Sequence, residues 1–235
     1  MQKLKNELAK YNIFLTEEQE AKMEQFSHLF QAVNAQMNLS SIRNPNEVEM
    51  KHFLDSLLLA HYGQIGQQKQ LLDLGTGGGF PGIPIKIQHP MMHVSFLDSV
   101  KKKLNFVREA CYKLHIDEVS FCDLRAEEAG RGLWRSSQDV VVARAVAYLP
   151  VLLEYAMPLL RVGGTLVAAK IDRDDEERRD SQKALRLLGA ELTSVHRYSI
   201  PGAKESRQVL VIYKHRATDD RFPRAVGVPA KSPLK

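Results

Sequence analysis

The hydrophobic pattern changes near residue 63, and the change divides the chain. Before it, apolar residues recur at helical spacing after Thr16-Glu-Glu-Gln19, a sequence typical of a capping box. Asn44-Pro45 marks a second helix start and is followed by an amphipathic run from Val48 to Tyr62. We therefore predict a helical extension over residues 1–62, joined by a polar link at 63–69 to the rest of the chain.

From residue 70 onward, short apolar runs alternate with helical segments, which predicts a mainly parallel sheet covered on both faces. The predicted class is α/β and Rossmann-like, with a core over residues 63–216. Only residues 199–206 separate the last two strands, too few for a helical crossover, so these strands should pair antiparallel. The seven predicted strands are 70–74, 93–98, 118–122, 138–144, 164–169, 190–198 and 207–214.

Two charged segments lie outside this pattern. Residues 172–180 form a dense charge run, which is typical of the solvated first turns of a helix. The tail over residues 217–235 is basic and proline-punctuated. It could be a frayed end or an extended arm that lies on phosphates, and the sequence leaves both open.

The loop after the first predicted strand is the most informative segment. An apolar run ends in Asp73, and the stretch 75–82 that follows is rich in glycine, so bare backbone could lie against a nucleoside. The dinucleotide pattern G-x-G-x-x-G fails from Gly75, because its third glycine falls on Phe80, and from Gly77 it begins two residues late. A nicotinamide oxidoreductase is therefore disfavoured. No Gly-Lys-Ser/Thr follows, so a phosphate-binding P-loop is excluded. The carboxylate of Asp73 just before the loop favours a cationic ligand.

Two further turns should meet this loop at one edge of the sheet. The second strand ends in Asp98-Ser99, where a carboxylate commonly holds a ribose. The third is followed by Arg125-Ala126-Glu127. Because ligands of open α/β sheets bind beyond the carboxyl ends of the strands, the three turns predict one pocket.

Composition narrows the classes of protein to which the chain could belong. A formal net charge of +5 permits a polyanionic substrate. Cys111 and Cys122 lack partners at metal spacing, His89 and His93 lack a third ligand, and we predict neither a metal site nor a disulfide. The longest strongly apolar run, Leu57 to Ala60, is too short for a membrane span, so we expect a cytoplasmic protein.

The layout resembles the class I S-adenosylmethionine-dependent methyltransferases, whose first two motifs match the Asp73–Gly79 loop and Asp98. The Asn/Asp-Pro-Pro-Tyr/Phe sequence of amino-group methylation is missing after the fourth strand, and no cysteine nucleophile stands beside a proline. A ring nitrogen such as guanine N7 carries no proton to remove. Alignment of donor and acceptor in a water-poor pocket would suffice for it.

A closer resemblance covers nearly the whole chain. It is similar to the bacterial small-subunit (16S) ribosomal RNA guanine-N7 methyltransferases, the RsmG or glucose-inhibited division protein B family. The motifs that carry the resemblance are Met37-Asn-Leu-Ser-Ser-Ile42, His52-x-x-Asp55-Ser56, Asp73–Pro84, Leu97-Asp98-Ser99-x-x-Lys102-Lys103, Arg125-Ala126-Glu127, Val142–Ala145, Lys170 and Pro223–Leu234.

The resemblance implies roles for individual residues. Arg144 would lie near both methyl donor and acceptor, and Arg144→Ala should lose turnover with the fold intact. His52 and Asp55, one helical turn apart, would cover the pocket. S-adenosylmethionine would be bound by Asp73, Gly75, Gly77, Gly79, Phe80, Asp98, Ser99, Ala126, Glu127 and Arg144. RNA would be bound by Lys102, Lys103, Arg125, Lys170, Arg224 and Lys231.

Two departures from the family pattern stand out. Val33-Asn34 replaces a common Trp-Asn, which weakens any stacking role there, and Ser40 replaces Thr but keeps the hydroxyl. We expect a monomer that acts on 16S rRNA or on the small ribosomal subunit. The rival from another class is a non-catalytic RNA- or ribosome-binding module that retains the fold, and an absence of cofactor binding would favour it.

Overall fold

The computed structural model describes residues 1–66, 70–172 and 175–235. Of the predicted link and charge run, residues 67–69 and 173–174 lie outside the described residues. The chain begins with helices α1 (Gln2–Ala9) and α2 (Glu17–Met37). The capping box predicted at α2 is present: Gln19 N donates to Thr16 Oγ1 at 3.2 Å, and Thr16 N donates to Gln19 Oε1 at 3.0 Å.

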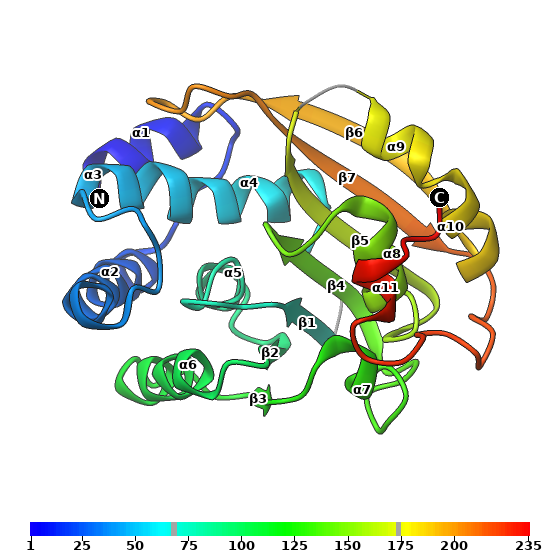
Figure 1. The fold of residues 1–235 in the computed structure, drawn as a ribbon. Coiled ribbons are helices and arrows are strands. Elements are labelled where there is room, and N and C mark those ends of the chain that lie inside the picture. The colour runs from blue at the N-terminus through cyan, green and yellow to red at the C-terminus, as the bar shows by residue number, and fades with distance from the viewer. Residues whose placement is uncertain (67–69, 173–174) are drawn as a thin grey trace.

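A second helical rod follows, made of α3 (Pro45–Val48), a π-helical turn (Glu49–Leu54) and α4 (Asp55–Tyr62). Asn44 caps it as expected, since its side chain accepts from Asn46 N at 2.9 Å. The predicted amphipathic pattern is wrong here, because residues 52–60 are buried all round. The rod runs through the interior and packs against α5, α1 and β5 (Figure 1).

In the described part of the chain, seven strands form one sheet in the order β3-β2-β1-β4-β5-β7-β6. β7 runs antiparallel to both of its neighbours, which confirms the antiparallel pairing predicted from the short connection. The parallel strands leave their carboxyl ends at one edge. The strands are β1 (Gln70–Leu74), β2 (His93–Leu97), β3 (Val119–Cys122), β4 (Gln138–Arg144), β5 (Leu160–Ile171), β6 (Ala190–Tyr198) and β7 (Arg207–Lys214).

Helices cover both faces of the sheet (Figure 1). Along β4 the side chains alternate between two cores. Val140 and Val142 face the N-terminal helices, α5 and α6, whereas Val141 and Ala143 face α7, α8 and α10. The remaining helices are α5 (Gly82–Gln88), α6 (Lys101–Lys113), α7 (Ala126–Ala129), α8 (Leu149–Ala156), α9 (Glu176–Asp180), α10 (Gln182–Leu188) and α11 (Val228–Lys231).

The C-terminal segment folds back onto the domain instead of fraying. Phe222 and Leu234 are buried against the second core. Arg135 donates to the carbonyl oxygens of Thr218 and Phe222 at 2.8 and 2.7 Å. Within the described parts of the chain, no helix combines the length and apolarity that a bilayer crossing requires.

Candidate active site

A pocket of about 440 Å³ opens at the carboxyl edge of the sheet, within the range of small-molecule sites. It lies where the turns after β1, β2 and β3 converge, as the strand pattern predicts. Six of its lining residues come from those turns and were expected there or at its mouth: Gly75, Asp98, Ser99, Arg125, Ala126 and Glu127.

Backbone hydrogen bonds tie the glycine loop to the end of β2. The N–H groups of Gly75 and Thr76 both donate to Leu97 O, at 2.8 and 3.1 Å. Gly75 adopts φ +72°, and a Cβ there would lie 3.0 Å from Val146 Cγ2. A glycine is therefore required, because a side chain would be strained and would crowd this wall of the pocket.

Asp98 fixes the loop from the opposite side. Its Oδ2 accepts from Gly77 N at 2.9 Å, and its Oδ1 accepts from Val100 N at 2.8 Å. Each carboxylate oxygen keeps a further lone pair, and the residue lines the pocket. A ligand with paired hydroxyl donors, such as a ribose, suits this position.

The third turn supplies a second acid. Ala126 begins α7 and Glu127 is buried at the pocket wall. Glu127 Oε1 accepts from Gly227 N at 2.9 Å, so the C-terminal segment holds its carboxylate. Aliphatic side chains of Leu97, Leu124 and Val151 complete this part of the lining. Apolar walls with a few fixed acceptors suit a nucleoside.

Asp73 is buried behind the loop and does not line the pocket. Its Oδ2 accepts from Gly82 N at 2.8 Å, at the start of α5, and Oδ1 has no hydrogen-bond partner among the residues that the structure describes. Burial raises its pKa to about 6, against the opposing effect of the hydrogen bond from Gly82. The carboxylate therefore braces the loop against α5, and its contact with a cofactor stays a prediction.

Phe80 was expected beside the cofactor, but its ring lies in an aromatic cluster below the loop. The ring stacks on His52 with centroids 4.7 Å apart and also contacts Phe26, Phe30 and Phe53. Gly79 also faces inward, because a Cβ there would lie 2.7 Å from Ile83. For Gly77, Gly79 and Phe80, a cofactor contact stays a prediction.

Arg144, at the end of β4, is held by the helical rod. Its Nη1 donates to Asp55 Oδ2 at 3.2 Å and to Lys51 O at 3.1 Å, and its Nη2 lies 3.0 Å from His52 Nδ1. Asp55 is fully buried and also accepts from Tyr198 Oη at 2.6 Å. Arg207 lies 3.6 Å from the same carboxylate. The placement of His52 and Asp55 on one helical face is confirmed. Both lie under Arg144 and outside the pocket lining, so their role as a cover stays a prediction.

A chain of hydrogen bonds orients His52. Its Nε2 lies 3.0 Å from Ser40 Oγ, and Ser40 N donates to Asn34 Oδ1 at 2.7 Å. Burial, together with the nearby Arg144 charge, lowers the His52 pKa to about 3. The ring is therefore neutral, with Nδ1 accepting from Arg144 and Nε2 donating to Ser40. Asn34 and Ser40 keep a structural role despite the departures from the family pattern.

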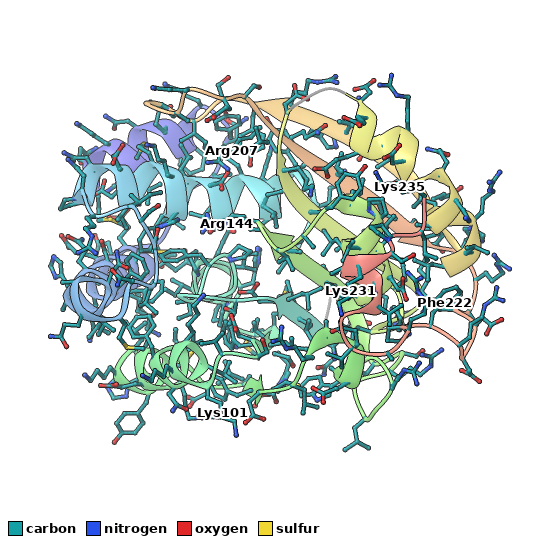
Figure 2. The ribbon with its side chains drawn as sticks, viewed as in Figure 1. Lys101, Arg144, Arg207, Phe222, Lys231 and Lys235 are labelled. Carbon is teal, nitrogen blue, oxygen red and sulfur yellow. The ribbon has the colours of Figure 1, made fainter. Side chains whose placement is uncertain are left out.

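The predicted RNA-binding cations fall into two groups. Lys102, Arg125 and Lys231 are exposed, and Figure 2 shows Lys231 on α11. Lys170 and Arg224 are engaged within the protein instead. Lys170 Nζ donates to Ala147 O at 2.6 Å and pairs with Glu177, whereas Arg224 pairs with the buried Glu154 at 2.6 Å. These contacts lend no support to RNA binding by Lys170 or Arg224, and Lys103 is half-buried.

Groups for covalent or metal-assisted catalysis are not gathered here. Cys111 and Cys122 are free and buried, and burial raises the pKa of the Cys111 thiol to about 12 and that of Cys122 above its usual value. Each packs in one of the two hydrophobic cores. Among the described residues, no group of three His, Cys, Asp or Glu side chains could hold a metal ion.

Sequence reasoning missed the far wall of the pocket. The segment after β4 and helix α8 contribute Val146, Ala147, Tyr148, Val151 and Tyr155, and the C-terminal helix contributes Ala230. For the residues after β4, the sequence offered only their position as a signal, because a loop that follows β4 must reach the same edge of the sheet. No such signal pointed to Ala230, since the C-terminal tail has no hydrophobic periodicity from which its path could be predicted.

Comparison with known proteins agrees with this fold. Solved structures with the same fold include TrmN from Thermus thermophilus (TM-score 0.55, 20% identity, 69% of this chain and 48% of that one). TYW2 from Pyrococcus horikoshii in complex with MeSAdo is another (TM-score 0.54, 12% identity, 68% and 61%). At these identities, the likeness concerns the fold alone.

Sequence relatives are much closer. The ribosomal RNA small subunit methyltransferase G of Staphylococcus aureus strain JH9 is 39% identical over 231 residues, which cover 98% of this chain and 97% of the relative. The same protein of strain Newman matches equally. The family model GidB, described as rRNA small subunit methyltransferase G, matches residues 19–209. The chain therefore belongs to the GidB family of small-subunit ribosomal RNA methyltransferases.

Proposed function

We propose that this methyltransferase uses S-adenosylmethionine and methylates N7 of one guanine in 16S ribosomal RNA. The observation that carries the proposal is the pocket at the carboxyl edge, where the loop at Gly75, the Asp98 carboxylate and the turn at Ala126 and Glu127 meet. Bound S-adenosylmethionine would supply an electrophilic methyl group on a sulfonium. The residues described above fit its ribose and its adenine.

The character of the nearby side chains favours a ring nitrogen as acceptor. His52 is a poor general base at neutral pH, since its pKa is lowered to about 3 and both ring nitrogens are engaged. The Cys111 thiol, with a pKa raised to about 12, is a poor nucleophile. Guanine N7 needs neither group, because its lone pair is free. The protein's work is then to orient the base and exclude water.

Arg144 supports the same assignment through its position. It ends β4 beside the glycine loop, and its guanidinium is fixed by Asp55 and His52. A fixed cation there can hold the guanine O6 or a flanking phosphate without donating a proton. We propose Arg144 as the residue that orients the acceptor base.

The decisive experiment uses methyl-labelled S-adenosylmethionine and small ribosomal subunits that lack the modification. We expect label in the rRNA, released as 7-methylguanosine on nucleoside analysis. Asp98→Ala should abolish labelling, whereas Asp123→Ala, an exposed acid one strand away, should retain it. Label on protein or on an exocyclic amino group would refute the N7 assignment. A wild-type protein that binds no cofactor would favour the non-catalytic RNA-binding module.

We also infer a monomer in the cytoplasm. The substrate is ribosomal RNA, and unpaired thiols fit a reducing compartment. Large exposed apolar side chains, such as Met91, Tyr112 and Leu133, come from separate elements. Scattered residues of this kind favour a chain that acts alone.

A further inference from the structure

The C-terminal segment reaches the proposed cofactor pocket. Gly227 N donates to Glu127 Oε1 at 2.9 Å, and α11 begins at the next residue. Ala230 of that helix lines the pocket together with Val151 and Tyr155 of α8. The segment therefore contributes one wall and also holds an acid in another.

One arginine secures both ends of this short helix. Arg224 N donates to Glu154 Oε1 at 2.8 Å, and its Nη2 donates to Glu154 Oε2 at 2.6 Å. The same Nη2 donates to Ser232 O at 2.8 Å, beyond the end of α11. Glu154 is completely buried. The ion pair of Arg224 and Glu154 contains more than one hydrogen bond, and such a charge-assisted pair has a specific geometry. It therefore sets where α11 lies.

A second tie lies at the end of the chain. Lys235 Nζ pairs with Asp180 at 2.8 Å and lies 4.8 Å from the centroid of the Tyr148 ring. Tyr148 also lines the pocket. Figure 2 places Lys231 and Lys235 on the same side of the molecule as α8. The segment is thus fixed at two points on either side of its pocket-lining residue.

We propose that α11 closes the pocket over the nucleoside part of the cofactor, and that Arg224 is the residue that positions it. This inference rests on the proposed function. An apolar wall at Ala230 would exclude water from the end of the pocket formed by Ala126 and Glu127. The tail predicted to bind RNA is, on this view, a component of the cofactor site.

The first test adds bulk at the wall. Ala230→Phe should raise the Kd for S-adenosylhomocysteine at least tenfold by calorimetry. Ala225→Phe should stay within twofold of wild type, because Ala225 is also exposed on the same segment but does not line the pocket. Both variants should melt close to wild type. Ala230→Phe binding within twofold of wild type overturns the proposal.

The second test separates positioning from general stability. Arg224→Met should raise the KM for S-adenosylmethionine about tenfold, with a much smaller change in kcat at saturating cofactor. Arg224→Lys should recover part of the loss, since it keeps the charge on Glu154. If the unpaired Glu154 carboxylate prevents Arg224→Met from folding, the Arg224→Lys variant still tests the role of the residue. An unchanged KM in Arg224→Lys overturns the role of Arg224. Wild-type protein that binds no cofactor would overturn the proposed function itself.

Discussion

At the scale of single residues, the pair of Arg144 and Asp55 joins the end of β4 to the helical rod. The side chain of Asp55 is 1% exposed and that of Arg144 is 12% exposed, so water screens the pair little. Removal of one partner from a buried ion pair leaves an uncompensated charge, which costs about 3–5 kcal/mol. Arg144→Ala should therefore keep its fold at a reduced stability.

We predict that Arg144→Ala loses turnover and also lowers the free energy of unfolding by about 3 kcal/mol, because among the described residues Asp55 then keeps only Tyr198 and the more distant Arg207. Urea denaturation and methyl transfer measured on the same samples check both effects. Arg197→Ala, which removes an exposed pair with Asp172, should cost less than about 1 kcal/mol. Equal stability losses in the two variants would contradict the prediction.

Both members of this pair were named from the sequence, but their contact was not. The family resemblance implied a place for Arg144 near methyl donor and acceptor, and a place for His52 and Asp55 over the pocket. Their contact joins residues 89 positions apart. It depends on the path of the rod through the core, which no local pattern encodes. The partnerships of the site had to come from the structure.

The neutral state of His52 gives stability a defined dependence on pH. Its pKa falls from 6.5 to about 3 on folding, because the ring is buried beside Arg144. The unfolded chain binds this proton below pH 6.5 and the folded chain does not. The stabilisation is therefore present above pH 6.5 and is lost progressively as the pH falls toward 3.

We predict that His52→Gln removes a stability loss of about 2 kcal/mol that wild type should undergo through this residue between pH 7 and 5. Urea midpoints across that range, converted with a common m-value, provide the measurement. Asp73, whose pKa is raised to about 6, acts in the opposite direction, since its contribution falls as the pH rises through that value. It is present in both proteins and cancels. Parallel curves for the two proteins would rule out a buried neutral His52.

At the scale of elements, the packing of α5 against β1 and β2 places the glycine loop. A Cβ on Gly82 would lie 2.5 Å from Phe96 Cε1 and 2.6 Å from Asp73 Oδ2. The first turn of α5 therefore depends on a close approach to both strands. The Asp73 carboxylate, which accepts from Gly82 N, lies directly in this contact.

We predict that Gly82→Ala lowers the free energy of unfolding by about 3 kcal/mol and weakens cofactor binding, because α5 must move and the loop with it. Thermal melts and calorimetry with S-adenosylhomocysteine measure the two effects. Gly132→Ala is the matched control, since its nearest atom would lie 3.4 Å away, an ordinary contact. A Gly82→Ala protein as stable as the control would show that α5 accommodates the extra carbon.

The strands themselves were largely predictable. Four of the seven have the predicted bounds, because apolar runs between helical segments mark buried parallel strands clearly. β5 begins at Leu160, four residues before the predicted start. A Cβ on Gly164 would lie 2.9 Å from Asp139 O, so glycine there permits close approach to β4. The π-helical turn at Glu49–Leu54 has no comparable sequence signal.

At the scale of the whole molecule, segments from both ends of the chain complete one edge of the sheet. The N-terminal rod supplies His52 and Asp55 beneath Arg144, and the C-terminal segment supplies Gly227 and Ala230 at the pocket. The predicted extension, core and basic arm are separate segments of the sequence, but all three contribute residues to this edge of the sheet. Around this edge, Lys102, Arg125 and Lys231 remain exposed.

From these three exposed cations we predict how the affinity for RNA depends on salt concentration. Neutralising phosphates releases counterions, and the slope of log K against log salt changes by about 0.7 per contact on single strands. A triple variant, Lys102→Gln with Arg125→Gln and Lys231→Gln, should therefore reduce the slope by about 2 in titrations of a labelled single-stranded fragment of 16S rRNA.

The control must lose the same charge elsewhere. Lys3, Lys5 and Lys10 lie on or next to α1, far from α7 and α11 in Figure 1, and all three are exposed. Their triple Gln variant carries the same net charge as the first variant, so a slope that falls equally in both would trace binding to overall charge alone. A slope that falls only in the first variant assigns the RNA to the rim of the pocket. There the acceptor base could reach Arg144, while the cofactor would lie behind it, enclosed by α11.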